Sequence, residues 1–337
     1  MTESTGIAKP FADVSYELWD SNTCVNMSAI KFVAEFGEIP RLSGSVDDTK
    51  TQWAELRGKL KDKYPPPEPR QGLVSSVETI HGVSIKTYFP TDTTGTEPVV
   101  IYFHSGGFVM GSVEDEDGIC RLLCHQGQMK IVGVDYSLAP ANPFPAALDE
   151  CVMVTRRALE EFNVKSLTLV GLSAGGNLAF ATALRLIGEG MAAAVKGVVA
   201  VAPVTLHPAV ALREHKHTFT AYGENDVYTI NSKSAMGAWL QAYHPPPSSD
   251  PLVSVVCHPN LEHLKKVYIT EFGLDTLRDD ARLMKAALEK AQVPVKYDAY
   301  PGYPHLSFLF PSKHLDDHRK EVFGNLLRGI AWIGESE

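Results

Sequence analysis

Short apolar segments that alternate with amphipathic ones are the feature that most constrains how this chain can fold. Six apolar runs suit strands buried on both faces, at residues 98–103, 131–135, 167–170, 197–202, 267–272 and 295–300. Helical patterns separate most of them, at residues 118–126, 146–162, 177–187 and 279–291. This alternation predicts an α/β fold with a mostly parallel central sheet flanked by helices.

Two stretches depart from this rhythm within the main part of the chain. Residues 73–80 and 83–89 alternate in polarity around a His-Gly pair, which predicts a β-hairpin ahead of the buried strands. Residues 207–251 are rich in His, Tyr and Pro and contain a helix candidate at 233–243. We expect them to form an insertion above the sheet.

The N-terminal region also differs from the alternating part. Its polar sequence contains helical patterns at residues 26–36 and 46–61. The proline-rich stretch 63–69 stops any helix, so we expect it to be a linker.

The composition argues against several classes of protein. The 337 residues carry a formal net charge of −9, which leaves no basic field for a nucleic-acid backbone. The apolar run 191–206 is interrupted by Lys196 and Pro203 and is too short to span a bilayer, so no membrane insertion is expected. The five cysteines follow no disulfide framework and the N-terminus shows no secretory signal pattern. We therefore expect a reduced, cytoplasmic protein.

The segment Leu167-Thr-Leu-Val-Gly-Leu-Ser-Ala-Gly-Gly176 places Ser173 directly after a predicted strand and before a helix. Glycines 171 and 175 permit the sharp turn of a nucleophile elbow, which holds a serine hydroxyl out at a helix N-terminus. The same turn could carry no chemistry, because a neutral serine is a weak nucleophile without a base. Its function therefore depends on partners elsewhere in the chain.

Candidate partners follow the last two predicted strands. In α/β-hydrolases an acid and then a histidine follow the serine, each in a loop beyond a late strand. Asp275 and His305 occupy these places, as orienting carboxylate and general base. Asp279, Asp280 and Glu271 are rival carboxylates, but Asp275 lies just past the strand end, whereas Asp279 begins a helix, where its charge suits the helix dipole. His305 could also be an ordinary loop histidine.

Acyl transfer further needs hydrogen-bond donors for the oxyanion that forms on the attacked carbonyl. The backbone N–H of Ala174, directly after the serine, is one predicted donor. The loop Phe103-His-Ser-Gly-Gly-Phe108 follows an earlier strand, and its glycines let the backbone approach a substrate. The sequence thus predicts a complete acyl-transfer site.

Four motifs in register make the chain resemble the hormone-sensitive-lipase group of α/β-hydrolase esterases. His104-Ser-Gly-Gly-Phe108 resembles the His-Gly-Gly-Gly loop of that family, and Asp135-Tyr-Ser-Leu-Ala-Pro140 resembles its Asp-Tyr-Arg-Leu-Ala-Pro segment. Gly171-Leu-Ser-Ala-Gly-Gly176 resembles its Gly-Asp-Ser-Ala-Gly-Gly elbow, and residues 273–279 resemble its acid segment. Four motifs in order over residues 73–330 are far more specific than any one of them.

The resemblance implies an α/β-hydrolase fold, no cofactor and no metal. Position by position it implies a nucleophile, an acid, a base and three oxyanion donors, which are Ser173, Asp275, His305, and Gly106, Gly107 and Ala174. It also implies a cap over the site. The expected division is a cap segment at residues 1–70, a cap insertion at 207–251, and two parts of the core at 71–206 and 252–337.

The chain departs from the family pattern at three positions. Ser105 replaces the first loop glycine, which is not a principal donor in the family, so the oxyanion hole should survive. Leu172 replaces the aspartate before the nucleophile and removes a usual polar contact. Leu306 replaces the glycine after the histidine, so the histidine loop either sits differently or faces a more apolar pocket.

Other side chains of the insertion have less specific interpretations. The cluster His207, His215 and His217 lacks a carboxylate or cysteine at a recognised zinc spacing, so we interpret it as polar cap surface rather than a metal site. The aromatic residues form either the core of the cap or the wall of a pocket; they are Phe219, Tyr222, Tyr228, Trp239 and Tyr243.

The predicted function is a serine hydrolase that cleaves a small-molecule carboxylic ester through Ser173, His305 and Asp275 and an acyl-enzyme. The same site could serve a specialised biosynthetic hydrolase, such as a lactonase, a deacetylase or a product-releasing enzyme. A non-hydrolytic cyclase or lyase with a tyrosine or His305 as base is another alternative. A ligand receptor is a different class, since the gibberellin receptor resembles this family and has lost the histidine; the presence of His305 favours turnover. A homodimer is compatible with the sequence.

Overall fold

An eight-stranded sheet forms the centre of the computed structural model, which describes residues 25–64, 72–210, 217–244 and 250–335. Its strands are β1 (Leu73–Ile80), β2 (Val83–Pro90), β3 (Val99–Phe103), β4 (Lys130–Asp135), β5 (Leu167–Leu172), β6 (Val195–Val201), β7 (Val267–Phe272) and β8 (Val295–Tyr300). They are ordered β1-β2-β4-β3-β5-β6-β7-β8. The β1–β2 and β2–β4 pairs are antiparallel, and all the other pairs are parallel. The predicted α/β fold with a mostly parallel sheet is confirmed.

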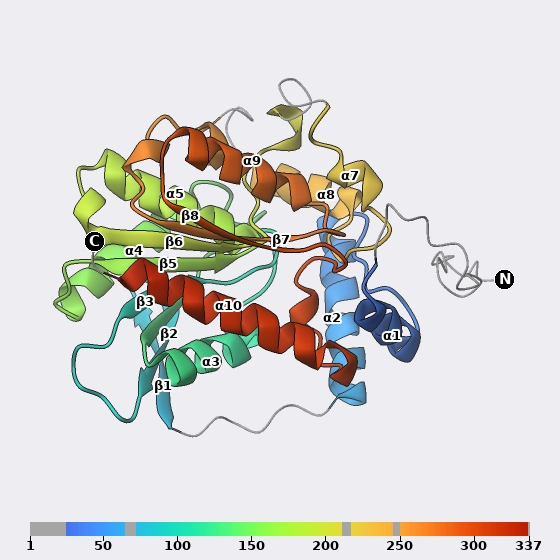
Figure 1. The fold of residues 1–337 in the computed structure, drawn as a ribbon, viewed down its shortest axis with the longest axis horizontal. Coiled ribbons are helices and arrows are strands. Elements are labelled where there is room, and N and C mark those ends of the chain that lie inside the picture. The colour runs from blue at the N-terminus through green and yellow to red at the C-terminus, as the bar shows by residue number, and fades with distance from the viewer. Residues whose placement is uncertain (1–24, 65–71, 211–216, 245–249, 336–337) are drawn as a thin grey trace.

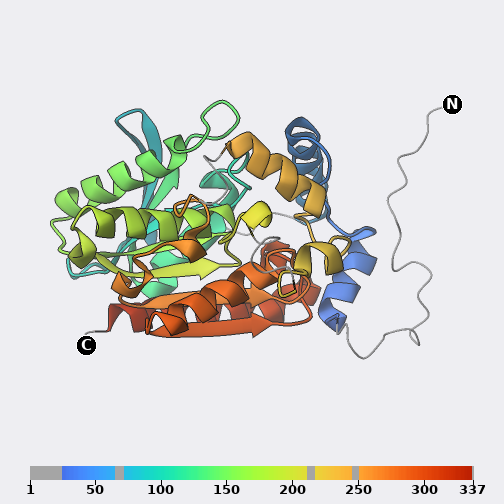
Figure 2. The same cartoon turned by 90° about the horizontal axis from the view of Figure 1, so that it is seen from above.

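Helices cover both faces of this sheet (Figures 1 and 2). They are α4 (Ala146–Glu161), α5 (Ala174–Gly188) and α9 (Arg278–Lys290) on one face, and α3 (Asp117–Gly127) and α10 (Asp316–Gly334) on the other. Because strand side chains alternate, Ile101 and Phe103 of β3 join the first core, whereas Val100 and Tyr102 join the second. Burial on both faces explains why the central strands are apolar throughout.

Four helices gather at the end of the sheet where the parallel strands finish. They are α1 (Met27–Phe36), α2 (Val46–Lys63), α7 (Ala221–Glu224) and α8 (Lys233–Tyr243), and they lie at the same end of the molecule in Figures 1 and 2. A capping box between Ser45 and Asp48 begins α2. The indole Nε1 of Trp239 in α8 donates to Thr49 Oγ1 in α2 at 3.0 Å, so segments 190 residues apart are joined over the strand ends.

The predicted elements agree with the structure apart from a few boundaries, one helix and the burial of one strand. Residues 295–300 were predicted to be buried on both faces, but β8 lies at the edge of the sheet and only its Tyr300 is buried. The strands at 267–272 and 295–300 and the helix at 233–243 have the predicted limits, whereas α5 begins at Ala174, three residues before its predicted start. Helix α10 was not predicted. Most of the predicted linker at 63–69 lies outside the described residues. None of the helices in the described ranges is long and apolar enough to cross a membrane.

Candidate active site

Ser173 stands at a sharp turn between β5 and α5. Its backbone has φ 55° and ψ −115°, an uncommon conformation for a residue with a side chain. A Cβ at Gly175 would lie 2.1 Å from the carbonyl oxygen of Phe103, so only glycine allows the helix to start this close to β3. The turn is fixed further by the Ser173 N–H, which donates to Val201 O at 2.8 Å. This geometry is that of the predicted nucleophile elbow.

A continuous hydrogen-bonded chain joins the three predicted side chains. His305 Nε2 lies 3.0 Å from Ser173 Oγ, and His305 Nδ1 lies 2.5 Å from Asp275 Oδ2. Asp275 follows the end of β7, and His305 follows the end of β8. All three side chains are buried. Such an arrangement lets a histidine accept the serine proton while a carboxylate holds the imidazole in one orientation.

The rival carboxylates are engaged elsewhere. Glu271 forms a two-pronged ion pair with Arg282, at 2.7 and 2.9 Å. Asp279 lies in the first turn of α9 and accepts from the backbone N–H groups of residues 220 and 221, at 2.7 and 2.8 Å. Asp280 accepts from the Thr205 N–H at 2.8 Å, and burial raises the pKa of its carboxyl well above its usual range. Among the described residues, Asp275 is the carboxylate bonded to His305.

The predicted oxyanion loop lies beside the elbow. Gly106 and Gly107 have φ of 119° and 61°, and within the described ranges their N–H groups donate to no protein acceptor. Ala174 is the first residue of α5, where N–H groups have no partner inside the helix. Tyr136 holds this loop in place, because its hydroxyl donates to His104 O at 2.9 Å and its ring stacks on the His104 ring with centroids 4.1 Å apart.

Ser105, the departure in this loop, is bonded to a buried carboxylate. Its N–H donates to Glu116 Oε1 at 3.0 Å, and its hydroxyl donates to the same oxygen. The other carboxylate oxygen accepts from the hydroxyl of Tyr102. Burial raises the pKa of Glu116, while the hydrogen bonds from Ser105 and Tyr102 oppose the shift. Glu116 was missed from the sequence, because it belongs to the acidic run 114–117, which has the composition of a solvated turn.

The histidine loop is held by aromatic packing. Leu306 adopts the left-handed conformation, with φ 48°, which glycine adopts without strain. Behind it, His318 of α10 stacks on Tyr303 with ring centroids 3.5 Å apart and contacts Ser307 Oγ at 3.0 Å through Nε2. Burial, with a smaller contribution from Arg319, lowers the pKa of His318 to about 3.

A cavity of about 640 Å³ opens onto Ser173 and His305. The predicted oxyanion loop also lines it, through Ser105, Gly106 and Gly107. Five charged residues line it as well: Arg57, Lys61, Glu114, Asp115 and Glu116. Its aromatic and aliphatic walls come from α2, α8, the residues next to these helices and the segment after β8, and include Leu42, Trp53, Leu60, Tyr64, Ile230, Trp239, Leu306, Leu309 and Phe310. Leu306 therefore makes the pocket more apolar, as one of the two sequence interpretations expected. The cavity suits a bulky apolar ligand with one reactive polar group.

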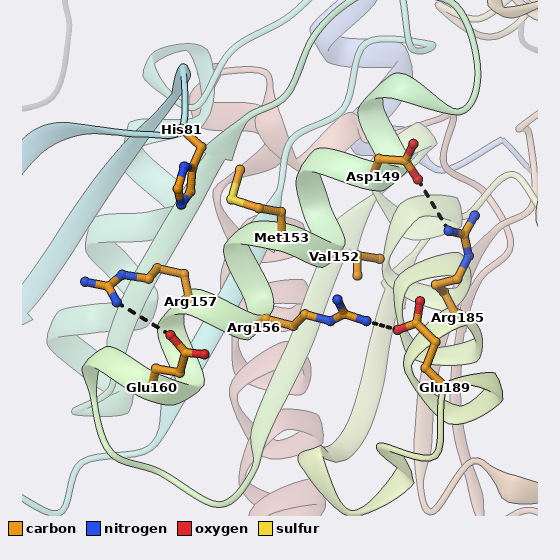
Figure 3. Close-up of a pocket in the computed structure, with 9 residues that line it drawn as sticks. All are labelled: His81, Asp149, Val152, Met153, Arg156, Arg157, Glu160, Arg185 and Glu189. Carbon is orange, nitrogen blue, oxygen red and sulfur yellow. Dashed lines mark hydrogen bonds and ion pairs between the residues drawn. The ribbon is translucent and has the colours of Figure 1, made fainter.

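A second hollow, of about 370 Å³, has a different character (Figure 3). Arg157 pairs with Glu160 at 3.5 Å, and Arg185 pairs with Asp149 at 3.4 Å. Figure 3 also shows the pair between Arg156 of α4 and Glu189, the residue that follows α5. Surface ion pairs of this kind provide no nucleophile with a base beside it, unlike Ser173 and His305 in the first cavity.

The structure also places several other side chains of the insertion, and Leu172 before the nucleophile. Trp239 of α8 is buried in the first core and also lines the cavity, so it contributes both to packing and to the pocket wall. Tyr222 stacks on Phe219 with centroids 5.3 Å apart. Leu172 is fully buried in the core. His215 lies outside the described residues.

Comparisons with known proteins agree with this fold. The family model for the alpha/beta hydrolase fold matches residues 100–309. The chain therefore belongs to the α/β-hydrolase family.

Two curated relatives identify the branch of that family. The versiconal hemiacetal acetate esterase of Aspergillus parasiticus is 46% identical over 304 residues, which cover 90% of this chain and 96% of that protein. The versiconal hemiacetal acetate esterase of Emericella nidulans is 46% identical over 285 residues, which cover 84% and 99%. The resemblance to the hormone-sensitive-lipase group of esterases is confirmed.

The solved structure of vibralactone cyclase shares the fold. It superimposes with a TM-score of 0.79 at 22% sequence identity, over 95% of this chain and 98% of that one. At this identity the likeness concerns architecture alone.

Proposed function

We propose that this protein is a serine esterase in which Ser173 is the nucleophile, His305 the general base and Asp275 the orienting acid. The observation that carries the proposal is the hydrogen-bonded chain from Ser173 Oγ through His305 to Asp275, in which Ser173 and His305 line a cavity with mainly apolar walls. A nucleophile, a base within reach and an oriented imidazole are the parts that acyl transfer needs.

The reaction follows from this geometry. His305 Nε2 takes the proton of Ser173 as its oxygen attacks the ester carbonyl, and the N–H groups of Gly106, Gly107 and Ala174 stabilise the oxyanion. His305 then protonates the leaving alcohol, and the acyl group stays on the serine. A water molecule, deprotonated by His305, hydrolyses the acyl-enzyme and restores the hydroxyl.

The substrate we propose is a short-chain ester, such as an acetate, of a large aromatic alcohol. The two relatives at 46% identity are named for an acetate ester, which supports the short acyl group. The cavity supports the alcohol, because four of its lining residues are the aromatic side chains of Trp53, Tyr64, Trp239 and Phe310. A narrow biosynthetic role also fits relatives that are named for a single ester.

We propose in addition that residues 1–70 and 207–251 act together as the cap over residues 71–206 and 252–337. Helices α2 and α8, from the two cap segments, both line the cavity. Cap composition would then set the substrate. A cytoplasmic location and a homodimer stay predictions from the sequence.

The test uses acetates of alcohols with similar basicity and increasing size: ethyl, benzyl and 1-naphthylmethyl acetate. We expect kcat/KM to rise along this series, and p-nitrophenyl acetate to be cleaved faster than the octanoate. Ser173→Ala, purified in the same way, should lose about 10⁴- to 10⁶-fold in kcat, as triad replacements do. Turnover by Ser173→Ala near the wild-type rate would refute the proposed chemistry. Turnover that depends on Ser173 but falls as the alcohol becomes larger would refute only the proposed substrate class.

A further inference from the structure

The insertion that forms part of the proposed cap also touches the triad. The side-chain amide of Asn231 donates from Nδ2 to Asp275 Oδ1 at 2.9 Å. The N–H of Leu277 donates to the same oxygen at 2.9 Å, and the opposite oxygen faces His305. Asp275 Oδ1 is therefore held by two donors, while Oδ2 is directed at His305.

Thr229 connects the same segment to the base. Its hydroxyl donates to Asn231 Oδ1 at 2.7 Å and accepts from the backbone N–H of His305 at 3.2 Å. Thr229 is fully buried and Asn231 is 1% exposed, so both contacts lie inside the folded protein. Two nearby side chains of the insertion thus contact the triad: Asn231 bonds to the side chain of Asp275, and Thr229 bonds to the backbone of His305.

The acid loop is tied to the insertion at three further points. Asn225 Nδ2 donates to Asp275 O at 2.8 Å and to Gly273 O at 3.1 Å. Thr276 Oγ1 donates back to Asn231 O at 2.8 Å. These bonds join residues 45 to 50 positions apart in sequence, so the loop that carries Asp275 is positioned from the insertion as well as from β7.

We propose that Asn231 and Thr229 are positioning residues of the triad, so that the docked insertion is part of the catalytic machinery as well as a pocket wall. The inference rests on the proposed function of Ser173, His305 and Asp275. The Asn231 amide spreads the negative charge of Asp275 and keeps its Oδ2 turned to His305. Without that donor, the carboxylate charge acts more strongly on the imidazole and favours its protonated form.

The decisive variant is Asn231→Leu, which removes the donor and keeps a similar volume. On an ester that the wild type cleaves, we expect kcat to fall about 10- to 100-fold, the range for losing a hydrogen bond to a charged group. The acid limb of the pH–kcat/KM profile should move to higher pH by roughly half a unit to one unit. Within the described part of the chain, Asp280 of α9 and Tyr222 of the insertion also interact electrostatically with Asp275. Both are the same in all the variants.

Ser232→Ala is the matched control. Ser232 is buried in the same segment, but its hydroxyl donates to Leu42 O rather than to the triad. This variant should leave the acid limb where it is in the wild type, even where it lowers stability. A second pair covers the case in which Asn231→Leu fails to fold: Thr229→Val should lower kcat, and Thr229→Ser, which keeps the hydroxyl, should restore it.

Two results would overturn the inference. One is that folded Asn231→Leu keeps the kcat and the acid limb of the wild type. If Asn231→Leu does not fold, the same result in Thr229→Val would overturn the inference. The other is an equal loss of kcat in Ser232→Ala and Asn231→Leu with no movement of the acid limb, which would show a merely structural role. A wild-type protein without Ser173-dependent turnover would instead refute the proposed function itself.

Discussion

His318 makes stability depend on pH in a way that can be calculated from its surroundings. The histidine is 3% exposed, stacked on Tyr303 and bonded to Ser307, and its pKa is lowered to about 3 by burial and then by Arg319. In the unfolded chain a histidine titrates near pH 6.5. The unfolded state therefore binds the proton first, and stability that is complete above pH 6.5 is lost as the pH falls toward 3.

The magnitude follows from the distance between the two titrations. At pH 5, about 1.5 units below the unfolded value, the loss is about 2 kcal/mol relative to pH 7. The carboxyls of Glu116 and Asp280 have raised pKa values and titrate in the opposite sense, so the wild type alone cannot isolate the contribution of His318. The comparison must be made with His318→Gln, which keeps a polar contact to Ser307 and cannot become charged.

Urea unfolding followed by circular dichroism at pH 7 and pH 5 gives the free energies of unfolding. We expect the fall between these pH values to be about 2 kcal/mol smaller in His318→Gln than in the wild type. His318→Phe, which keeps the stacking on Tyr303, should behave in the same way. An equal fall in all three proteins would refute the assignment of His318 as a buried neutral side chain.

Three further substitutions test the loops around the cavity. Gly107→Ala should lower kcat by about 10²-fold or more, because its Cβ would lie 2.4 Å from the Trp239 ring and displace an oxyanion donor; steady-state kinetics measures this. Glu116→Ala should lower the free energy of unfolding by about 3 kcal/mol and also reduce kcat, since it leaves the buried hydroxyl of Tyr102 and the two donors of Ser105 without their acceptor; urea unfolding and kinetics check both. Leu306→Gly should raise KM for the naphthylmethyl ester more than for ethyl acetate, because it removes an apolar wall.

Most of the fold was predictable because the spacing of apolar residues along the chain indicates which side chains are buried. The strands at 267–272 and 295–300 are bounded by turns, and their limits were predicted correctly. Helix α10 was missed although a signal was present: its apolar residues Val322, Leu326, Ile330 and Ile333 recur at helical spacing and face the second core.

The site was predictable only where chemistry has a fixed motif. Ser173 and its flanking glycines need a particular turn, and the order of acid and histidine follows the strand order. Glu116, Asn231 and Thr229 carry no such pattern, because each acts through partners that only the folded chain brings close, such as Asp275, 44 residues from Asn231. A polar residue that becomes a buried support has the same local sequence as one on the surface.

The most direct test of the central claim is to label the nucleophile and read its position by mass spectrometry. A fluorophosphonate should add once to the wild-type protein, on the peptide that contains Ser173, and the modified protein should have lost its esterase activity. Ser173→Ala should take up no label, and His305→Ala should react far more slowly, because the base that activates the serine is missing. A label on another residue, or esterase activity that persists with Ser173 fully modified, would contradict the account.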